Sequence, residues 1–152
     1  MLNTNENIAN QKPANHFTTD FKMQNTHILI VDHNDISNHQ LSLIFDRFHV
    51  KSDVAKSGKE AVRLYQEHPY DIVFMDSLSA SDMDGVEAVN GIRGLSQHGK
   101  NQLIVGMISD HPGAVDFRTR IKAFQVELFL LKPVNYFQIA VILRNELRDK
   151  IL

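Results

Sequence analysis

The pattern of hydrophobic positions changes at His27. From there on, short apolar runs bounded by polar residues alternate with segments in which apolar residues recur every three or four positions. The runs cover residues 28–31, 50–55, 72–75, 103–107 and 128–131. Three of them are apolar throughout and rich in β-branched residues, which is typical of strands buried on both faces of a parallel sheet.

The segments between and after the runs have the periodicity of amphipathic helices. We predict helices over residues 41–48, 61–65, 86–92 and 116–124, and from 135 to about 150, with Asp84 as the N-cap of the third. Five strand–helix units in sequence predict an α/β fold. Its form is a flavodoxin-like, doubly wound parallel sheet of five strands with helices on both faces.

The first 26 residues lack such a pattern. Six of them are Asn, and their apolar residues are sparse and without period. We therefore predict a flexible N-terminal tail over 1–26 and a single domain over 27–152. In the alternative interpretation, Phe17, Phe21 and Met23 dock on the domain or on a partner. The predicted domain leaves no residues for an output domain, so we expect the protein to signal by being bound.

The composition of the chain excludes several classes of function. The chain has 152 residues, with 16 basic and 18 acidic side chains and a net charge of −2. A chain so close to neutral has no general attraction for nucleic acid or for an anionic membrane. The absence of Cys excludes disulfides and thiol nucleophiles, and no apolar stretch has the form of a membrane span or a signal peptide. We expect a cytoplasmic protein that binds neither nucleic acid nor membranes.

Side chains capable of chemistry gather at one predicted edge of the sheet. In a doubly wound fold, functional groups lie at the carboxyl ends of the strands. The residues at those ends are Asp32 and His33, Asp76, Ile108 and Ser109, and Lys132 and Pro133. Two carboxylates on one rim are suited to bind a hard divalent cation, and one of them is suited to attack a phosphoryl group. A neighbouring Lys would pair with that phosphate.

Four motifs in order make residues 28–150 similar to the receiver domain of two-component response regulators. They are ILIVDHND, DIVFMD, the MDG of 83–85 and the LLKP of 130–133. The resemblance implies the (βα)5 receiver fold, phosphorylation of Asp76 by a histidine kinase or phosphotransfer protein, and contact of Lys132 with the phosphate. It also implies that Asp32 is the first carboxylate of the family's acidic pair, and that the peptide bond before Pro133 is cis.

Several family positions are altered in this chain. His33 stands where the family has its second carboxylate, the direct Mg²⁺ ligand, and imidazole replaces an oxygen ligand poorly, so we expect impaired Mg²⁺ binding. The loop 77–85 is longer than usual and lacks the family's Pro. Ile108 stands at the position of the hydroxyl residue that senses phosphate, with Ser109 adjacent to it. Phe129 holds the aromatic switch position without a hydroxyl.

His33 leaves three interpretations open. It is an ordinary polar residue, or a protonated imidazole that partly replaces the missing cation between Asp32 and Asp76, or a transition-metal ligand together with these carboxylates. The other seven His, His68 among them, show no metal-ligand spacing and are predicted to be surface or turn residues.

Two functions are compatible with these features. The first is a stand-alone atypical receiver in a phosphorelay, not an enzyme, which accepts phosphate on Asp76 and contacts a downstream target protein. The alternative is a phosphorylation-independent pseudo-receiver that serves as an interaction or dimerisation module. Asp76 and Lys132 favour the first function, whereas His33 and Ile108 favour the second.

The last predicted helix suggests a contact surface. Phe137 and Val141 lie outside its main apolar stripe, either as additional core or as part of an interface. Because this helix is apolar over much of its circumference, we favour an interface, such as a homodimer through the last two helices.

Overall fold

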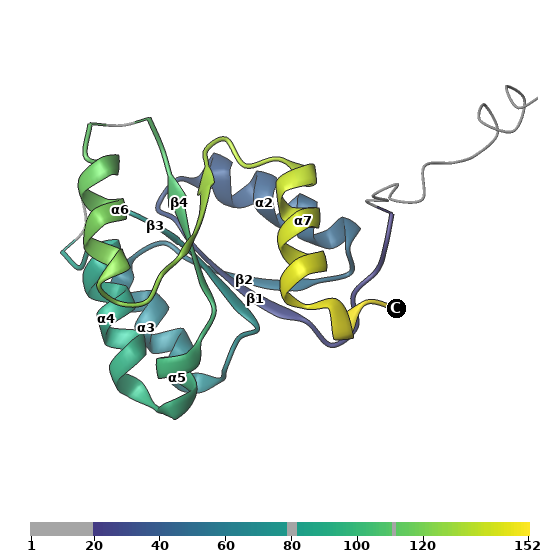
Figure 1. Cartoon of the computed structure of the whole chain (residues 1–152), viewed down its shortest axis with the longest axis horizontal. Helices are drawn as coiled ribbons and strands as arrows, with labels where there is room; N and C mark the ends of the chain where they lie inside the picture. The colour runs from purple at the N-terminus through teal and green to yellow at the C-terminus, as the bar shows by residue number, and fades with distance from the viewer. Residues whose placement is uncertain (1–19, 79–81, 111) are drawn as a thin grey trace, which may run out of the picture.

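The computed structural model describes residues 20–78, 82–110 and 112–152. Five strands form one parallel sheet in the order β2-β1-β3-β4-β5, as Figure 1 shows. They are β1 (His27–Val31), β2 (Lys51–Ala55), β3 (Ile72–Asp76), β4 (Ile104–Ile108) and β5 (Leu128–Leu131). Because β2 lies on one side of β1 and the later strands on the other, the predicted doubly wound α/β fold is confirmed.

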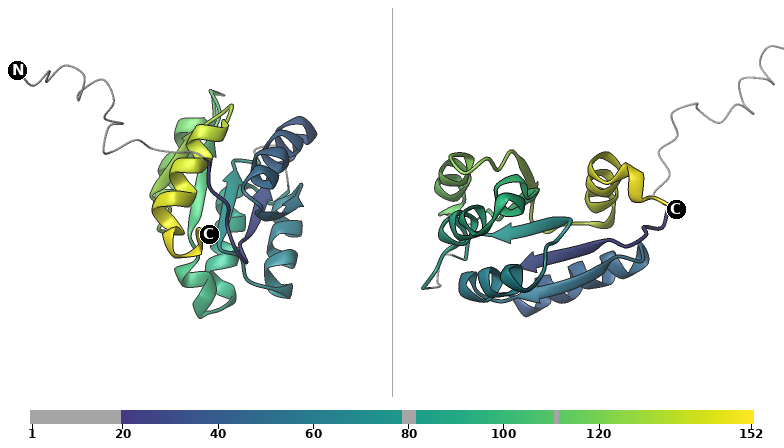
Figure 2. Two further views of the ribbon diagram at one scale, coloured as in Figure 1. Left: turned by 90° about the vertical axis from the view of Figure 1, so that its right-hand side faces the viewer. Right: turned by 90° about the horizontal axis from the view of Figure 1, so that it is seen from below.

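Helices cover both faces of this sheet (Figures 1 and 2). One face carries α2 (Asp35–Arg47) and α7 (Tyr136–Glu146), and the other carries α3 (Gly58–Glu67), α4 (Gly85–Leu95) and α6 (Ala114–Lys122). A short α5 (Gln97–Asn101) follows α4. None of the helices in the described part of the chain is long and apolar enough to cross a membrane.

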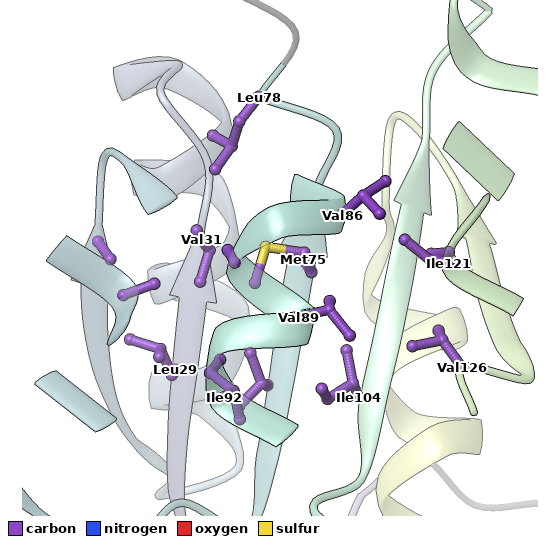
Figure 3. Packing of buried hydrophobic residues seen from close by; sticks show 14 of the residues in the cluster. Leu29, Val31, Met75, Leu78, Val86, Val89, Ile92, Ile104, Ile121 and Val126 are labelled. Atoms are coloured by element: carbon purple, nitrogen blue, oxygen red, sulfur yellow. The ribbon is translucent and has the colours of Figure 1, made fainter. Parts of the chain in front are cut away.

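Each face of the sheet buries its own apolar cluster. Along β1, Leu29 and Val31 contribute to the cluster beneath α3, α4 and α6, whereas Ile28 and Ile30 contribute to the one beneath α2 and α7. Successive side chains of a strand point to opposite faces, which explains why the strand sequences are uninterrupted apolar runs. Figure 3 shows the first cluster, in which α4 packs across the central strands.

Some helix boundaries differ from the prediction. α6 begins at Ala114 rather than 116, and α7 ends at Glu146, where a 3₁₀ turn over Arg148–Lys150 replaces the expected continuation. The helix α5 was not predicted, because its sequence QHGKN contains no apolar side chain that could reveal a period. The predicted cap of α4 is confirmed, since the Asp84 side chain accepts a hydrogen bond from the Glu87 N–H at 2.9 Å.

Residues 20–26, which the prediction assigned to the N-terminal tail, contact the domain. Met23 is only 2% exposed, and its N–H donates to the Phe48 carbonyl at 2.8 Å. It forms an antiparallel bridge with Ile151, and the Phe21 ring lies 4.9 Å from the Phe48 ring. Residues 20–26 therefore pack on the domain. This agrees with the alternative interpretation, in which Phe21 and Met23 dock on it. Residues 1–19 of the predicted tail lie outside the described residues.

Candidate functional site

Asp32, Asp76 and Lys132 meet at the carboxyl edge of the sheet. Asp32 directly follows β1, Asp76 ends β3, and Lys132 directly follows β5. The Lys132 Nζ contacts Asp32 Oδ2 and lies 2.8 Å from Asp76 Oδ1. Both carboxylates are buried, with Asp32 0% and Asp76 5% exposed. The structure thus brings together three residues that the sequence placed at neighbouring strand ends.

Main-chain groups fix the orientation of both carboxylates. Asp32 Oδ1 accepts a hydrogen bond from the Asn34 N–H at 2.9 Å, and Asp76 Oδ2 accepts one from the Leu78 N–H at 3.1 Å. Leu78 has a φ of 51°, in the left-handed region, so the chain turns sharply after Asp76. These bonds satisfy buried oxygens that would otherwise be costly to desolvate. Residues 79–81 of the altered loop lie outside the described residues.

Lys132 carries a positive charge in this site. Burial disfavours the charged ammonium, but hydrogen bonds to Asp32 and Asp76 and the attraction of their charges outweigh it and raise the pKa of Lys132 above its ordinary value. Two carboxylates facing one ammonium leave the trio with a net negative charge. A phosphoryl group added here would therefore need further positive charge beside Lys132.

His33 lies at the open side of the two carboxylates. Its side chain is 60% exposed, and its Nδ1 lies 3.8 Å from Asp32 Oδ1 and 3.9 Å from Asp76 Oδ2. These separations exceed hydrogen-bonding distance. The imidazole can therefore act on the carboxylates through its charge or through a shared ligand, and the three nearest ligand atoms of Asp32, His33 and Asp76 lie within 4.8 Å of one another.

The predicted switch positions lie on β4 and β5. The paired register joins Gly106 to Phe129 and Ile108 to Leu131, so Ile108 is the last paired residue of β4. Its side chain is 7% exposed and belongs to the same apolar cluster as the half-buried Phe129 ring. The strand thus ends on an aliphatic side chain, and Ser109 follows the end of the strand without a shift of register.

The connection after β5 completes the edge. The Lys132 N–H donates to the Ile108 carbonyl at 2.8 Å. The peptide bond between Lys132 and Pro133 is cis, which is the isomer that the resemblance implied.

Fold and site together define a receiver-type module, in which a buried carboxylate at the end of the central strand faces a Lys from the edge strand. The chain belongs to the response regulator receiver domain family, whose model matches residues 28–144. It is therefore a receiver domain of the kind used in two-component signalling. Such domains are in general signalling modules without enzymatic activity of their own. No curated protein matches the sequence significantly.

Solved receiver structures share this fold. The receiver domain of Saccharomyces cerevisiae Ssk1, crystallised with the histidine phosphotransfer protein Ypd1, is 22% identical with a TM-score of 0.70, covering 84% of this chain and 93% of that one. Vibrio cholerae CheY4 is 21% identical with a TM-score of 0.69, and the match covers 80% of this chain and 98% of that one. The receiver domain of the Pseudomonas aeruginosa histidine kinase PA1611 is 21% identical with a TM-score of 0.71, and the match covers 81% of this chain and 98% of that one.

The PA1611 receiver coordinates a magnesium ion in its active-site cleft. The residues of the present chain fit this ion poorly. Mg²⁺ requires a near-octahedral set of oxygen ligands, whereas the third side chain beside Asp32 and Asp76 is the imidazole of His33. In addition, the Lys132 ammonium already contacts both carboxylates. We therefore assign no chemical step at this site to Mg²⁺.

Sequence spacing missed a second group of ionisable side chains. His27 and His68, which were predicted to be surface or turn residues, converge on Asp53 near the opposite end of the sheet. The three residues are far apart along the chain and come together because β1 pairs with β2 and α3 returns beside them. The signal that could have revealed them is the strand register rather than any short motif.

Proposed function

We propose that this receiver accepts a phosphoryl group on Asp76 and passes the signal on through protein–protein contacts. The observation that carries this proposal is the contact of the Lys132 ammonium with Asp76, at 2.8 Å on the carboxyl edge of the sheet. It pairs a carboxylate nucleophile with a cation that can neutralise the incoming phosphoryl oxygens.

The proposed transfer is a single displacement at phosphorus. A carboxylate oxygen of Asp76 attacks the phosphohistidine of a histidine kinase or phosphotransfer protein, and an O–P bond forms as the N–P bond breaks. The electron pair of the broken bond returns to the donor imidazole, which then takes up a proton. The structural likeness to a receiver solved with a phosphotransfer protein supports this class of donor.

His33 is proposed to supply the second positive charge. Its Nδ1 lies within 4 Å of both carboxylates, and its exposure leaves it free to reorient toward an added phosphoryl group. A protonated His33 together with Lys132 would balance the charge that a divalent cation balances in receivers with a full acidic pair.

A phosphorylation-independent pseudo-receiver is the second candidate. The observation that favours it is the burial of Ile108 in the apolar cluster, because an aliphatic side chain cannot donate a hydrogen bond to a phosphoryl oxygen. In this case, Asp76 and Lys132 form a structural ion pair, and the domain binds its partner without phosphate.

The face formed by α6, β5 and α7 is the proposed contact surface for the target or for a second copy. Val115, Leu131 and Phe137 are 78%, 65% and 56% exposed there. Large apolar side chains that face solvent are common in interaction sites. Val141, the other residue predicted to lie at this interface, is half-buried.

Intact-mass spectrometry with acetyl phosphate tests the proposed function. The wild-type chain is expected to gain the mass of one phosphoryl group, in Mg²⁺ and in excess chelator alike, whereas Asp76→Asn gains none. An adduct that forms only with Mg²⁺ would leave Asp76 as acceptor but contradict the role proposed for His33. No adduct on wild type under either condition would establish the pseudo-receiver instead.

His33→Asp provides a matched variant for the same experiment. It restores an oxygen ligand at the position where the family has its second carboxylate, so adduct formation is expected to become dependent on Mg²⁺. His39→Asp, an exposed substitution on α2, is the control and should behave as wild type. Equal Mg²⁺ dependence of His33→Asp and wild type would show that residue 33 does not determine the cation of the site.

A further inference from the structure

A cluster of two imidazoles and one carboxylate lies away from the proposed phosphoryl site. His27 Nε2 is 2.9 Å from Asp53 Oδ2, and His68 Nε2 is 3.5 Å from the same oxygen. His27 begins β1, whereas Asp32 follows the other end of that strand. Five residues of extended chain separate the two by about 16 Å, so the cluster is a separate site.

The His27 imidazole lacks the partner that its position requires. Its Nε2 is buried and makes no hydrogen bond to any of the described residues, because its approach to Asp53 does not have hydrogen-bond geometry. Buried polar atoms are satisfied in the great majority of cases, and an exception calls for an explanation. A cation bound between His27 and Asp53 would give the His27 Nε2 its missing partner.

Surrounding groups hold the cluster in place. The buried Tyr70 hydroxyl donates to Asp53 Oδ2 at 2.8 Å, and the Tyr70 ring packs at a tilt against the rings of His27 and His68. The His27 N–H donates to Asp71 Oδ2 at 2.8 Å, which anchors the start of β1. Outer-shell bonds of this kind orient the ligands of metal sites.

The spacing of the three donors suits a small transition-metal ion. Bonds of about 2.0–2.2 Å in a tetrahedron place ligand atoms roughly 3.3–3.6 Å apart. Of the two separations from Asp53 Oδ2, 3.5 Å lies in that range and 2.9 Å is somewhat shorter. The His27 and His68 rings are stacked at 4.8 Å, so one of them must turn to face a shared ion. His68, at the exposed end of α3, has room to turn because its side chain is 36% exposed.

We propose that His27, Asp53 and His68 bind a divalent transition-metal ion with the preferences of Zn²⁺. Two imidazoles and one carboxylate favour such an ion over Mg²⁺ or Ca²⁺, which prefer oxygen ligands throughout. Three protein ligands leave a fourth position for water or for a partner's side chain. The ion joins β1, β2 and the end of α3, next to the segment at residues 20–26 that packs on the domain.

Metal titration of the full-length, tag-free protein tests this site. Zn²⁺ is added in a calorimeter, and Co²⁺ is followed by its visible absorption. Wild type is expected to bind one equivalent of each, and the affinity should fall by at least about ten-fold in His68→Ala and Asp53→Asn. The controls are His39→Ala and His33→Ala, which should bind as wild type. His33→Ala also separates this site from the one at the carboxyl edge.

Two results would overturn the proposal. In the first, His33→Ala no longer binds one metal ion tightly whereas His68→Ala still does, which would place the ion at the carboxyl edge. The other is the absence of binding to wild type below millimolar metal, which would leave only the contacts of the two imidazoles with Asp53. If a variant fails to fold, paramagnetic broadening by Co²⁺ in the NMR spectrum of wild type gives the answer. Resonances of His27, Asp53 and His68 should broaden before those of Asp32 and Asp76.

Discussion

Replacement of Lys132 by Met is expected to destabilise the domain strongly. The substitution keeps the apolar stem of the side chain but removes the ammonium that contacts both Asp32 and Asp76. Removing one partner of a buried ion pair costs about 3–5 kcal/mol, because the remaining charge stays buried. The Lys132 side chain is 18% exposed, which admits some water, so we expect a loss at the lower end, about 3 kcal/mol.

Urea unfolding at pH 7 measures this loss, with the free energy of unfolding taken from the midpoint and the slope. Lys56→Met is the matched control. Lys56 also pairs with a carboxylate, Asp35, at 2.6 Å, but both side chains are more than half exposed, so its removal should have little effect. Equal midpoints for Lys132→Met and Lys56→Met would refute the idea that Lys132 neutralises a buried acidic pair.

The pH dependence of the same variant provides a second check. The pKa of Lys132 is raised in the folded chain. The charge of Lys132 therefore contributes fully to stability at pH values below the ordinary pKa of Lys, and this contribution is lost as the pH rises through the higher pKa of the folded chain. The difference between wild type and Lys132→Met should therefore be large at pH 7 and shrink at alkaline pH. It should also shrink in strong acid, where uncharged carboxyl groups need no cation.

Four further substitutions test the packing and the burial of single residues. Gly85→Ala should lower the free energy of unfolding by about 1–3 kcal/mol, because the added Cβ would lie 2.2 Å from a main-chain oxygen of β3. Gly94→Ala, whose Cβ would meet no atom within 4 Å, should stabilise α4 slightly. Similar effects of the two substitutions on the urea midpoint would contradict this. Met23→Ala should cost about 2–5 kcal/mol if residues 20–26 pack as described, and an unchanged midpoint would show a detached tail. Burial raises the pKa of Tyr65 to about 12. The unfolded chain therefore loses the proton of the Tyr65 hydroxyl at a lower pH than the folded chain does, so the free energy of unfolding should fall between about pH 10 and 12. Tyr65→Phe should remove part of that alkaline loss, and parallel pH profiles of Tyr65→Phe and wild type would argue against it.

The strands and the carboxyl edge could be predicted from the sequence because both depend on local pattern. The apolar run before Asp76 identifies a buried strand, and the ends of parallel strands share one edge, so Asp32, Asp76 and Lys132 follow from the order of elements alone. The same logic could not place the imidazole of His33, because its position depends on side-chain rotation at the end of a strand rather than on the strand itself.

Features that depend on distant contacts were left open or missed. Met23 is an isolated apolar residue in a polar segment, and it is buried because Phe48 and Ile151, far along the chain, provide its surroundings. His27 and His68 likewise have no short spacing. The pairing of β1 with β2 and the return of α3 bring them to Asp53. In both cases the sequence pattern is silent because the partner residues belong to other elements.

Trapping the phosphorylated residue tests the central claim most directly. After treatment with acetyl phosphate, borohydride reduces an aspartyl phosphate to homoserine, and peptide sequencing by mass spectrometry then locates the modified position. The account predicts homoserine at position 76 in wild type and its absence in Asp76→Asn. A wild-type protein with no homoserine, or with homoserine at position 32 instead, would contradict it.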